Sequence, residues 1–338
     1  MLTLDGSAGE GGGQILRTAL SLSIVTGIPF RIQRIRAARP KPGLARQHLT
    51  AVHAAAGVGG AELEGADLRS TDLTFRPGGI FPGEYRFSTE GAGSTTLVFQ
   101  TVLPPLLVAS GPSEMVLEGG THNPFAPPFD FLDRAFAPLL GRMGGGVRLD
   151  LERPGFYPSG GGRFTARIIP TDTLRPLSLP ERGAVLRRST RALVAHLPRH
   201  IAERELQTAG EVLGIPADAR SVVEIQDPPG PGNVVVIEIA CQDVTEVFTG
   251  FGRRGVPAED VARGAADRAR DWEAAGVAAG PHLADQLLLP LALAGGGSFT
   301  TVAPTAHSRT NADVIRQFLD VDVGFQDEGN GRWQVTVG

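Results

Sequence analysis

The sequence contains very little lysine and cysteine. Of its 32 basic residues only Lys41 is a lysine, and it lies between Pro40 and Pro42. A phosphate-binding loop of the Gly-Lys-Ser/Thr type is therefore excluded, and a lysine nucleophile would have to be Lys41. The single cysteine, Cys241, excludes an internal disulfide and a metal cluster built from cysteines.

Long hydrophobic runs are also missing. No apolar stretch reaches the roughly 18 residues that a membrane-spanning helix needs. The run 287–294 is interrupted by Pro290 and followed by three glycines, and residues 1–6 lack the pattern of a signal peptide. We therefore expect a cytoplasmic globular protein without a membrane partner. Its 338 residues, 41% of them hydrophobic, suffice for one large or two ordinary domains.

The charge is unevenly placed along the chain. A net charge of −4 argues against a protein that coats nucleic acid broadly. Basic residues nevertheless gather in the segment 34–46, where two prolines stiffen the chain before an expected helix. These cations could converge on one phosphate-bearing ligand. A solvated loop is the alternative.

The order helix, strand, helix, strand, strand occurs three times, which predicts a repeated α/β unit. The first unit comprises helices 14–25 and 44–56 and strands 30–35, 61–68 and 72–76. Strand 85–88 precedes the second, with helices 94–108 and 129–142 and strands 114–118, 147–153 and 162–169. The third comprises helices 282–294 and 311–319 and strands 299–302, 321–326 and 332–337. Three such units around a shared helical centre would bury the apolar face of every sheet.

Residues 180–275 do not follow this order. They predict strands 184–195, 222–225, 234–241 and 245–250 and helices 200–213 and 257–272. We therefore expect an α/β (α+β) protein of two domains. Residues 1–179 and 276–338 would form the large domain of three units, and residues 180–275 a smaller inserted α/β domain.

Glycine-rich loops precede two predicted helices, at residues 9–14 and 90–94. Such glycines let the backbone approach a ligand and leave helix N–H groups open to an anion. Glu10 would repel a phosphate unless a divalent cation lay between them; alternatively it stabilises the helix start. His307 lies in the turn before the predicted helix 311–319, which makes it a candidate nucleophile or acid–base group towards a phosphorylated ligand.

Four polar residues lie within apolar predicted helices: Gln100, His282, Asp285 and Gln286. Polar groups there must be hydrogen-bonded internally or face a ligand, and both alternatives stay open. The segment 119–131 combines prolines with phenylalanines and could enclose a nucleobase, although ordinary packing is the simpler explanation. None of the seven histidines has a spacing typical of zinc ligands.

Together these motifs resemble the RNA 3′-terminal phosphate cyclase family. The resemblance extends over residues 5–337 and is carried by segments 5–17, 39–48, 119–121, 155–162, 284–286 and 304–307. It implies a large domain of three βαβαββ-type repeats, similar to the C-terminal domain of translation initiation factor three, with a smaller inserted α/β domain. It also implies ATP and a divalent metal, Mg²⁺ or Mn²⁺, as requirements for activity.

The reaction that the resemblance implies converts an RNA 3′-phosphate into a 2′,3′-cyclic phosphodiester. His307 would take AMP from ATP and release pyrophosphate. The RNA 3′-phosphate would then receive the AMP, and the neighbouring 2′-hydroxyl would displace it. Covalent catalysis of this kind divides one difficult displacement into easier steps.

The resemblance also implies roles for individual residues. Glu10 would hold the metal, and the phosphate contacts would come from Gln14, Arg17, Arg39 and Arg46. The nucleoside would be held by Gln100, Pro127, Phe131, His282, Leu283, Ala284, Asp285 and Gln286, with Pro127 and Phe131 enclosing the adenine. His282 departs from the family, which has tyrosine there, and the charge of an imidazole depends on pH.

Two other classes of protein remain alternatives. A non-catalytic relative would bind ribosomal RNA during ribosome assembly, but such relatives lack the nucleophilic histidine that His307 supplies. An enzyme resembling enolpyruvyl transferases would rely on lysines, which this chain lacks. The sequence leaves open the RNA substrates, the preferred metal and whether the chain forms a homodimer.

Overall fold

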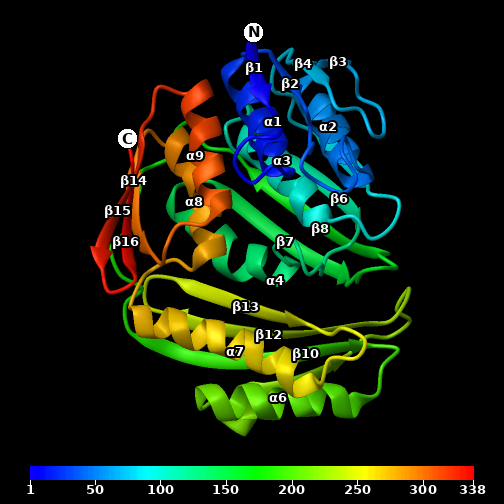
Figure 1. Ribbon diagram of the computed structural model, residues 1–338, viewed down its shortest axis with the longest axis vertical. Helices are drawn as coiled ribbons and strands as arrows, with labels where there is room; N and C mark the ends of the chain where they lie inside the picture. Colours follow the sequence, from blue (N-terminus) through cyan, green and yellow to red (C-terminus); the bar gives the residue numbers. More distant parts are fainter.

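The computed structural model describes residues 1–338, which form four four-stranded sheets and a set of helices (Figure 1). The α/β class predicted from the sequence is confirmed. The first sheet has the order β1-β2-β4-β3. Its elements are β1 (Leu2–Asp5), α1 (Gln14–Thr26), β2 (Phe30–Gln33), α2 (Arg46–Gly59), β3 (Glu62–Glu64) and β4 (Leu73–Arg76).

The second sheet has the order β5-β6-β8-β7. Its elements are β5 (Glu84–Ser88), α3 (Thr95–Leu107), β6 (Ser113–Gly119), α4 (Phe129–Phe131), α5 (Ala137–Arg142), β7 (Gly146–Arg153) and β8 (Gly162–Ile169). A π-helical turn, Leu132–Phe136, joins α4 to α5, so the single helix predicted for residues 129–142 is widened in its middle.

The third sheet draws one strand from before residues 180–275 and three from after them. Its order is β15-β16-β14-β9. Its elements are β9 (Leu177–Leu179), α8 (Pro281–Leu293), β14 (Gly297–Thr301), α9 (Ala306–Phe318), β15 (Val323–Gly329) and β16 (Arg332–Val337). The sequence did not predict β9, because three residues are too few to show a periodicity.

These three sheets share one arrangement of strands. In each, the first strand lies at one edge and runs parallel to the second. The fourth strand pairs with the second in antiparallel fashion, and the third occupies the far edge. The short strands β1 and β9 therefore have the same place in their sheets as β5, although the sequence indicated only β5.

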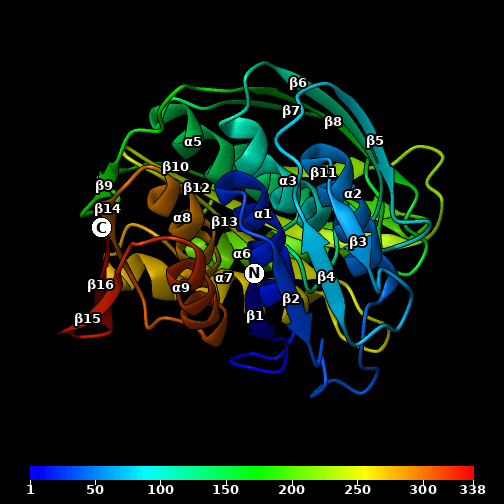
Figure 2. The same cartoon turned by 90° about the horizontal axis from the view of Figure 1, so that it is seen from above.

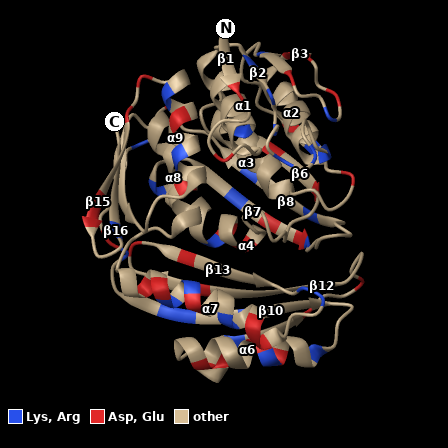
Figure 3. Ribbon diagram, in the orientation of Figure 1, with Lys and Arg blue, Asp and Glu red and all other residues tan.

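The fourth sheet belongs to the segment 180–275 and has the order β11-β10-β12-β13. Its elements are β10 (Val185–Ala195), α6 (Arg199–Leu213), β11 (Arg220–Glu224), β12 (Gly232–Cys241), β13 (Thr245–Phe251) and α7 (Ala258–Ala275). It lies at the bottom of Figure 1 with α6 and α7. Figure 3 shows charges of both signs on these two helices. The division of the chain into two domains at residues 180 and 275 stays a prediction.

Apolar helices fill the centre between the first three sheets (Figure 2). Helix α3 buries 11 of its 13 residues and α1 buries 10 of 13, so both are surrounded by protein. A helix that is apolar on nearly all sides, such as α3, is stable only in the interior, and α1 lies beside it with buried apolar and small polar residues, so both helices lie inward and the sheets outward. None of the helices combines the length and the apolar character that crossing a bilayer requires.

Helix α9 begins at Ala306, five residues before the start predicted from the sequence. Its N-cap, Thr305, accepts a hydrogen bond from the backbone N–H of Ser308 at 3.1 Å. A threonine at this position satisfies one of the N–H groups that a helix start leaves open, so the helix extends back to it. The prediction that His307 lies in a turn is therefore wrong, because it lies in the first turn of α9.

We expect Phe164→Ala to lower the free energy of unfolding by about 3–5 kcal/mol. Phe164 is fully buried on β8 and meets Phe99 and Phe129 edge to face, so truncation leaves a cavity. Ile169→Ala is the control, because Ile169 ends the same strand and is 54% exposed. Urea unfolding monitored by circular dichroism measures both variants. Equal losses in both would contradict the packing described here.

Candidate active site

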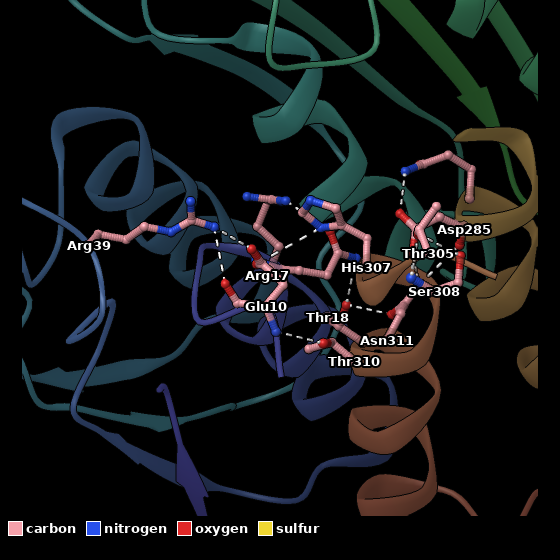
Figure 4. A network of polar contacts seen from close by, with 12 residues as sticks. Glu10, Arg17, Thr18, Arg39, Asp285, Thr305, His307, Ser308, Thr310 and Asn311 are labelled. Atoms are coloured by element: carbon pink, nitrogen blue, oxygen red, sulfur yellow. Dashed lines mark hydrogen bonds and ion pairs between the residues drawn. The ribbon is translucent and has the colours of Figure 1, made fainter. Parts of the chain in front are cut away.

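Hydrogen bonds between side chains join the N-terminal parts of α1, α8 and α9 (Figure 4). Gln14 Nε2 donates to Thr18 Oγ1 at 3.2 Å, and Thr18 Oγ1 donates to Asn311 Oδ1 at 2.8 Å. Asn311 Nδ2 in turn donates to Asp285, to its backbone oxygen at 3.0 Å and its Oδ1 at 3.2 Å. Three segments far apart in the sequence are thereby held at one place.

The loop before α1 brings the carboxylate of Glu10 to the same place. The backbone N–H of Glu10 donates to Thr310 Oγ1 at 3.0 Å, which fastens the loop to α9. Gly9 adopts φ +55°, and a Cβ at Gly9 would lie 2.1 Å from Thr310 Oγ1. A side chain at residue 9 is therefore excluded both by the backbone conformation and by the close approach of α9.

The Glu10 carboxylate lies between a guanidinium and an imidazole. Its Oε2 is 2.6 Å from Arg39 Nη2, and its Oε1 is 3.9 Å from His307 Nδ1. Only 5% of the Glu10 side chain is exposed, whereas 56% of the His307 side chain is. The structure thus brings together Glu10, Arg39 and His307, which the sequence analysis placed in one site, and leaves the imidazole accessible to a ligand.

A second carboxylate, Asp285, lies deeper in the protein, at the other end of the hydrogen-bonded chain. Burial raises its pKa to about 6, against the opposing influence of the His307 and Arg17 charges and of hydrogen bonds from Asn311 and Gln286. Gln286 Nε2 donates to Asp285 Oδ2 at 3.3 Å, and Gln100 Nε2 donates to Gln286 Oε1. Gln100, Asp285 and Gln286 therefore form one connected polar group; that they hold a nucleoside stays a prediction.

Arg17 supplies a positive charge between the two carboxylates. Its Nη2 donates to Gln14 Oε1 at 2.9 Å. The surrounding protein lowers the pKa of the guanidinium, and Asp285 and Glu10 act in the opposite direction. Because the ordinary value is so high, Arg17 stays charged at neutral pH and suits an anionic ligand.

A small cavity of about 40 Å³ lies among these side chains. Polar groups of α1, α3, α8 and α9 line one part of it and apolar groups the rest. The lining residues are Gln14, Arg17, Thr18, Ser21, Gln100, Leu103, Pro104, Leu107, Phe136, Asp285, Gln286, Leu289, Pro290 and Asn311. The cavity is about the size of a water molecule or two, so a nucleotide would have to lie over its mouth rather than inside it.

The other predicted site residues differ in their accessibility. Leu283 and Ala284 are buried in α8, and Phe131 is only 2% exposed. Pro127 is half-buried, and His282 and Arg46 are exposed at the starts of α8 and α2. The structure records no hydrogen bond or ion pair that joins Pro127, Phe131 or Arg46 to the cluster around Glu10 and Asp285. Their assignment to the site stays a prediction.

Four residues of this cluster were not predicted as site residues: Thr18, His48, Thr310 and Asn311. Burial, together with Arg17 and Arg36, lowers the pKa of His48 to about 3, so its imidazole is neutral. Its Nδ1 accepts the backbone N–H of Ala45 at 3.3 Å. Thr310 and Asn311 come three and four residues after His307, on the same helix, so they lie about one helical turn from it. No signal in the sequence pairs Thr18 with Asn311.

The residues present fit a divalent metal that is held by one carboxylate of the protein and mainly by oxygens of a bound phosphate and of water. Nowhere in residues 1–338 do three His, Cys, Asp or Glu side chains meet as a metal site. A metal at Glu10 would therefore have one carboxylate ligand and take the others from phosphate and water, as Mg²⁺ commonly does. Arg39, which now pairs with Glu10, is exposed and could turn to a phosphate instead.

A glycine-rich loop, arginines and an accessible histidine at helix starts define the chain as an α/β protein suited to phosphate chemistry. The RNA 3′-terminal phosphate cyclase family matches residues 8–325. The chain belongs to the RNA 3′-terminal phosphate cyclase family. The family resemblance inferred from the sequence is thereby confirmed.

Relatives in this family match the chain over nearly its whole length. The RNA 3′-terminal phosphate cyclase of Koribacter versatilis is 54% identical over 98% of this chain and 93% of its own. That of Salmonella paratyphi C is 48% identical over 100% of this chain and 97% of its own. Among solved structures, the enolpyruvyl transferase NikO from Streptomyces tendae covers 99% of this chain and 47% of its own, at 12% identity and TM-score 0.39. A likeness this weak carries no argument.

We expect Asp285→Asn to stabilise the protein by about 3 kcal/mol at pH 8 and by about half as much at pH 5. The pKa of Asp285, about 6, lies above the ordinary value of 3.8, so the folded state binds the proton more tightly than the unfolded state. The wild type therefore loses stability as pH rises from about 3.8 to about 6, the interval between the two pKa values. The Asp285→Asn variant has no carboxyl at this position and should not lose stability in this way.

Urea unfolding at the two pH values measures the difference between Asp285→Asn and the wild type. Asp313→Asn is the control, because the Asp313 side chain is on α9 and 70% exposed. A stability difference between Asp285→Asn and the wild type that is the same at both pH values would show that the Asp285 carboxyl does not titrate as described.

Proposed function

We propose that this protein converts an RNA 3′-terminal phosphate into a 2′,3′-cyclic phosphodiester at the expense of ATP, through an adenylylated histidine. Family membership supports the cyclase activity. The observation that carries the mechanism is the placement of His307. Its imidazole is exposed in the first turn of a helix, beside Glu10 and within a cluster that includes Arg17 and Arg39.

In the first step the imidazole attacks the α-phosphorus of ATP. A P–N bond forms, the P–O bond to the β-phosphate breaks, and pyrophosphate leaves. The Nδ1 atom of His307 faces Glu10, which leaves Nε2 as the attacking nitrogen. A hydrogen bond from Nδ1–H to the carboxylate would favour the tautomer with a free lone pair on Nε2 and stabilise the charge that the ring gains.

In the second step an oxygen of the RNA 3′-phosphate attacks the same phosphorus. The P–N bond breaks and an RNA–adenylate forms, with a phosphoanhydride bond between RNA and AMP. The neighbouring 2′-hydroxyl then attacks the RNA phosphorus, loses its proton, and expels AMP as the cyclic diester closes. Each step exchanges one bond at phosphorus, so the products are the cyclic phosphate, AMP and pyrophosphate.

The surrounding residues divide between phosphates and nucleoside. Gln14, Arg17, Arg39 and Arg46 would contact phosphates, and Glu10 would hold Mg²⁺ or Mn²⁺ against them. A divalent ion there would offset phosphate charge during the displacement. The proposed nucleoside contacts are Gln100, Pro127, Phe131, His282, Leu283, Ala284, Asp285 and Gln286. We further propose that the protein acts in the cytoplasm; a homodimer is left open.

His307→Ala should abolish labelling of the protein by α-labelled ATP in the presence of a divalent metal. The variant should keep its fold, since the His307 side chain is exposed and its contact with Glu10 Oε1, at 3.9 Å, is longer than a hydrogen bond. The wild-type label should be acid-labile and hydroxylamine-resistant, as a phosphoramidate is. His53→Ala is the control, because His53 is an exposed histidine on α2. Labelling of His307→Ala at the wild-type level would remove His307 from the mechanism.

His282→Tyr should change how ATP affinity depends on pH. His282 is exposed to solvent on one side, but the protein around the rest of the ring lowers its pKa, and the charges of Arg268 and His307 lower it further, so the ring is neutral near pH 7. Wild-type affinity should fall at acid pH, where the ring takes up a proton. The tyrosine variant should lack that part of the decline. ATP affinity is measured by equilibrium binding from pH 5 to 8. Identical profiles for the two proteins would show that His282 does not contact the adenine.

A further inference from the structure

Helix α8 carries several proposed nucleoside contacts close to its start. His282 follows the N-cap, Gly280, by two residues, and Asp285 and Gln286 lie within the next turn and a half. Gly280 has no side chain with which to cap the helix. The position and direction of this helix start must therefore be fixed by groups from elsewhere in the chain.

Two strands hold the segment that leads into α8. On one side β14 fastens residues 278 and 279: Ala278 N–H donates to Thr300 Oγ1 and Ala279 N–H to the Thr300 backbone oxygen, each at 2.9 Å. On the other side lies β13, a strand of the segment 180–275. From it the side chain of Glu246 reaches Gly280, whose N–H donates to Glu246 Oε2 at 2.6 Å.

The Glu246 carboxylate is almost wholly buried, with 2% exposed. Its other oxygen, Oε1, accepts the N–H of the next residue, Val247, at 3.1 Å. No cation pairs with it, so its only compensation for leaving water is these two backbone donors, one of them at the start of α8. Burial raises its pKa to about 7 in spite of both bonds. Such a group is costly to keep in the interior, which points to a use beyond packing.

The bond resembles half of a capping box, in which an acidic side chain accepts the N–H of the N-cap residue. In an ordinary capping box the acidic residue lies within the helix itself, three residues after the cap. Here it comes from a strand 34 residues earlier in the chain. The contact is also tight, because a Cβ at Gly280 would lie 2.8 Å from Oε2. A charge at the start of α8 also interacts favourably with the helix dipole.

We propose that Glu246 is a positioning residue for nucleotide binding: through its bond to Gly280 it sets the start of α8, and with it His282, Asp285 and Gln286. This gives the segment 180–275 a role in the reaction without a catalytic group of its own. The inference rests on the proposed function, in which α8 holds the nucleoside of ATP.

The chain offers a matched control in Glu205, on α6. Glu205 is also fully buried, and burial likewise raises its pKa to about 7. Its Oε2 accepts a hydrogen bond from Asn233 Nδ2 at 2.8 Å, so its contact lies within the segment 180–275. Replacing Glu205 therefore perturbs a comparable buried carboxyl without touching α8.

The first experiment compares adenylylation kinetics of Glu246→Gln, Glu246→Ala and Glu205→Gln with those of the wild type. Glutamine keeps one acceptor oxygen but turns an NH₂ group towards the second backbone donor. We expect both Glu246 variants to raise KM for ATP about tenfold or more, equivalent to ~1.4 kcal/mol, with kcat at saturating ATP changed less than about threefold. Glu205→Gln should leave KM within about twofold of the wild type.

The second experiment measures amide hydrogen exchange on the same proteins without ATP. Loss of the carboxylate should speed exchange at Gly280 and in the first turn of α8, and Glu205→Gln should not. In the wild type, added ATP should slow exchange at Gly280 and Val247 together, because one carboxylate accepts both N–H groups. This wild-type measurement decides the matter even if neither Glu246 variant folds.

The outcomes separate this inference from the proposed function. A wild type that takes no label from ATP would overturn the proposed function itself. A wild type that takes label, with Glu246 variants whose KM equals that of Glu205→Gln, would overturn only the role of Glu246. So would protection of α8 by ATP that leaves Val247 unchanged.

Discussion

The buried hydrogen-bonded chain from Gln14 through Thr18 and Asn311 to Asp285 is the contact on which the site depends. It joins α1, α8 and α9, which belong to opposite ends of the sequence. Each helix start leaves N–H groups without partners, and their partial positive charges add where the starts lie together. An anion in front of them therefore meets several weak attractions at once, before any arginine is counted.

The near absence of lysine is consistent with the chemistry proposed. A lysine nucleophile must lose a proton from a group whose ordinary pKa is about 10.4, whereas imidazole is largely neutral at pH 7. With histidine as nucleophile, the cations are free to be arginines, which stay charged and can bind phosphate oxygens in pairs. Arg17 is held inside the cluster, whereas Arg39 reaches it from an exposed loop.

Helices and long strands could be predicted from the sequence because their apolar periodicity is strong, as in α1 and α3. The short strands β1 and β9 could not, since pairing with a neighbour rather than any pattern of their own makes them strands. In the candidate site, Glu10 and His307 could be singled out from the sequence because glycines and a helix start surround them; their roles stay predictions. Thr18 and Asn311 were not, because their bond joins residues 293 apart and each is unremarkable alone. The role of Glu246 could not be predicted either, because its partner is the backbone N–H of Gly280, which lies on another element.

The pairing of β9 with β14 has a consequence for the order of events during synthesis. All strands of the first and second sheets have been synthesised once Ile169 has emerged. Strand β9, Leu177–Leu179, can pair only after its partner β14, Gly297–Thr301, has been made. At about 5–20 residues per second this interval is on the order of ten seconds. The segment 180–275 can fold during it. Helix α8, which is made just before β14, would then meet Glu246 already in place, so the helix that we propose to hold the nucleotide would pack against a segment that has already folded.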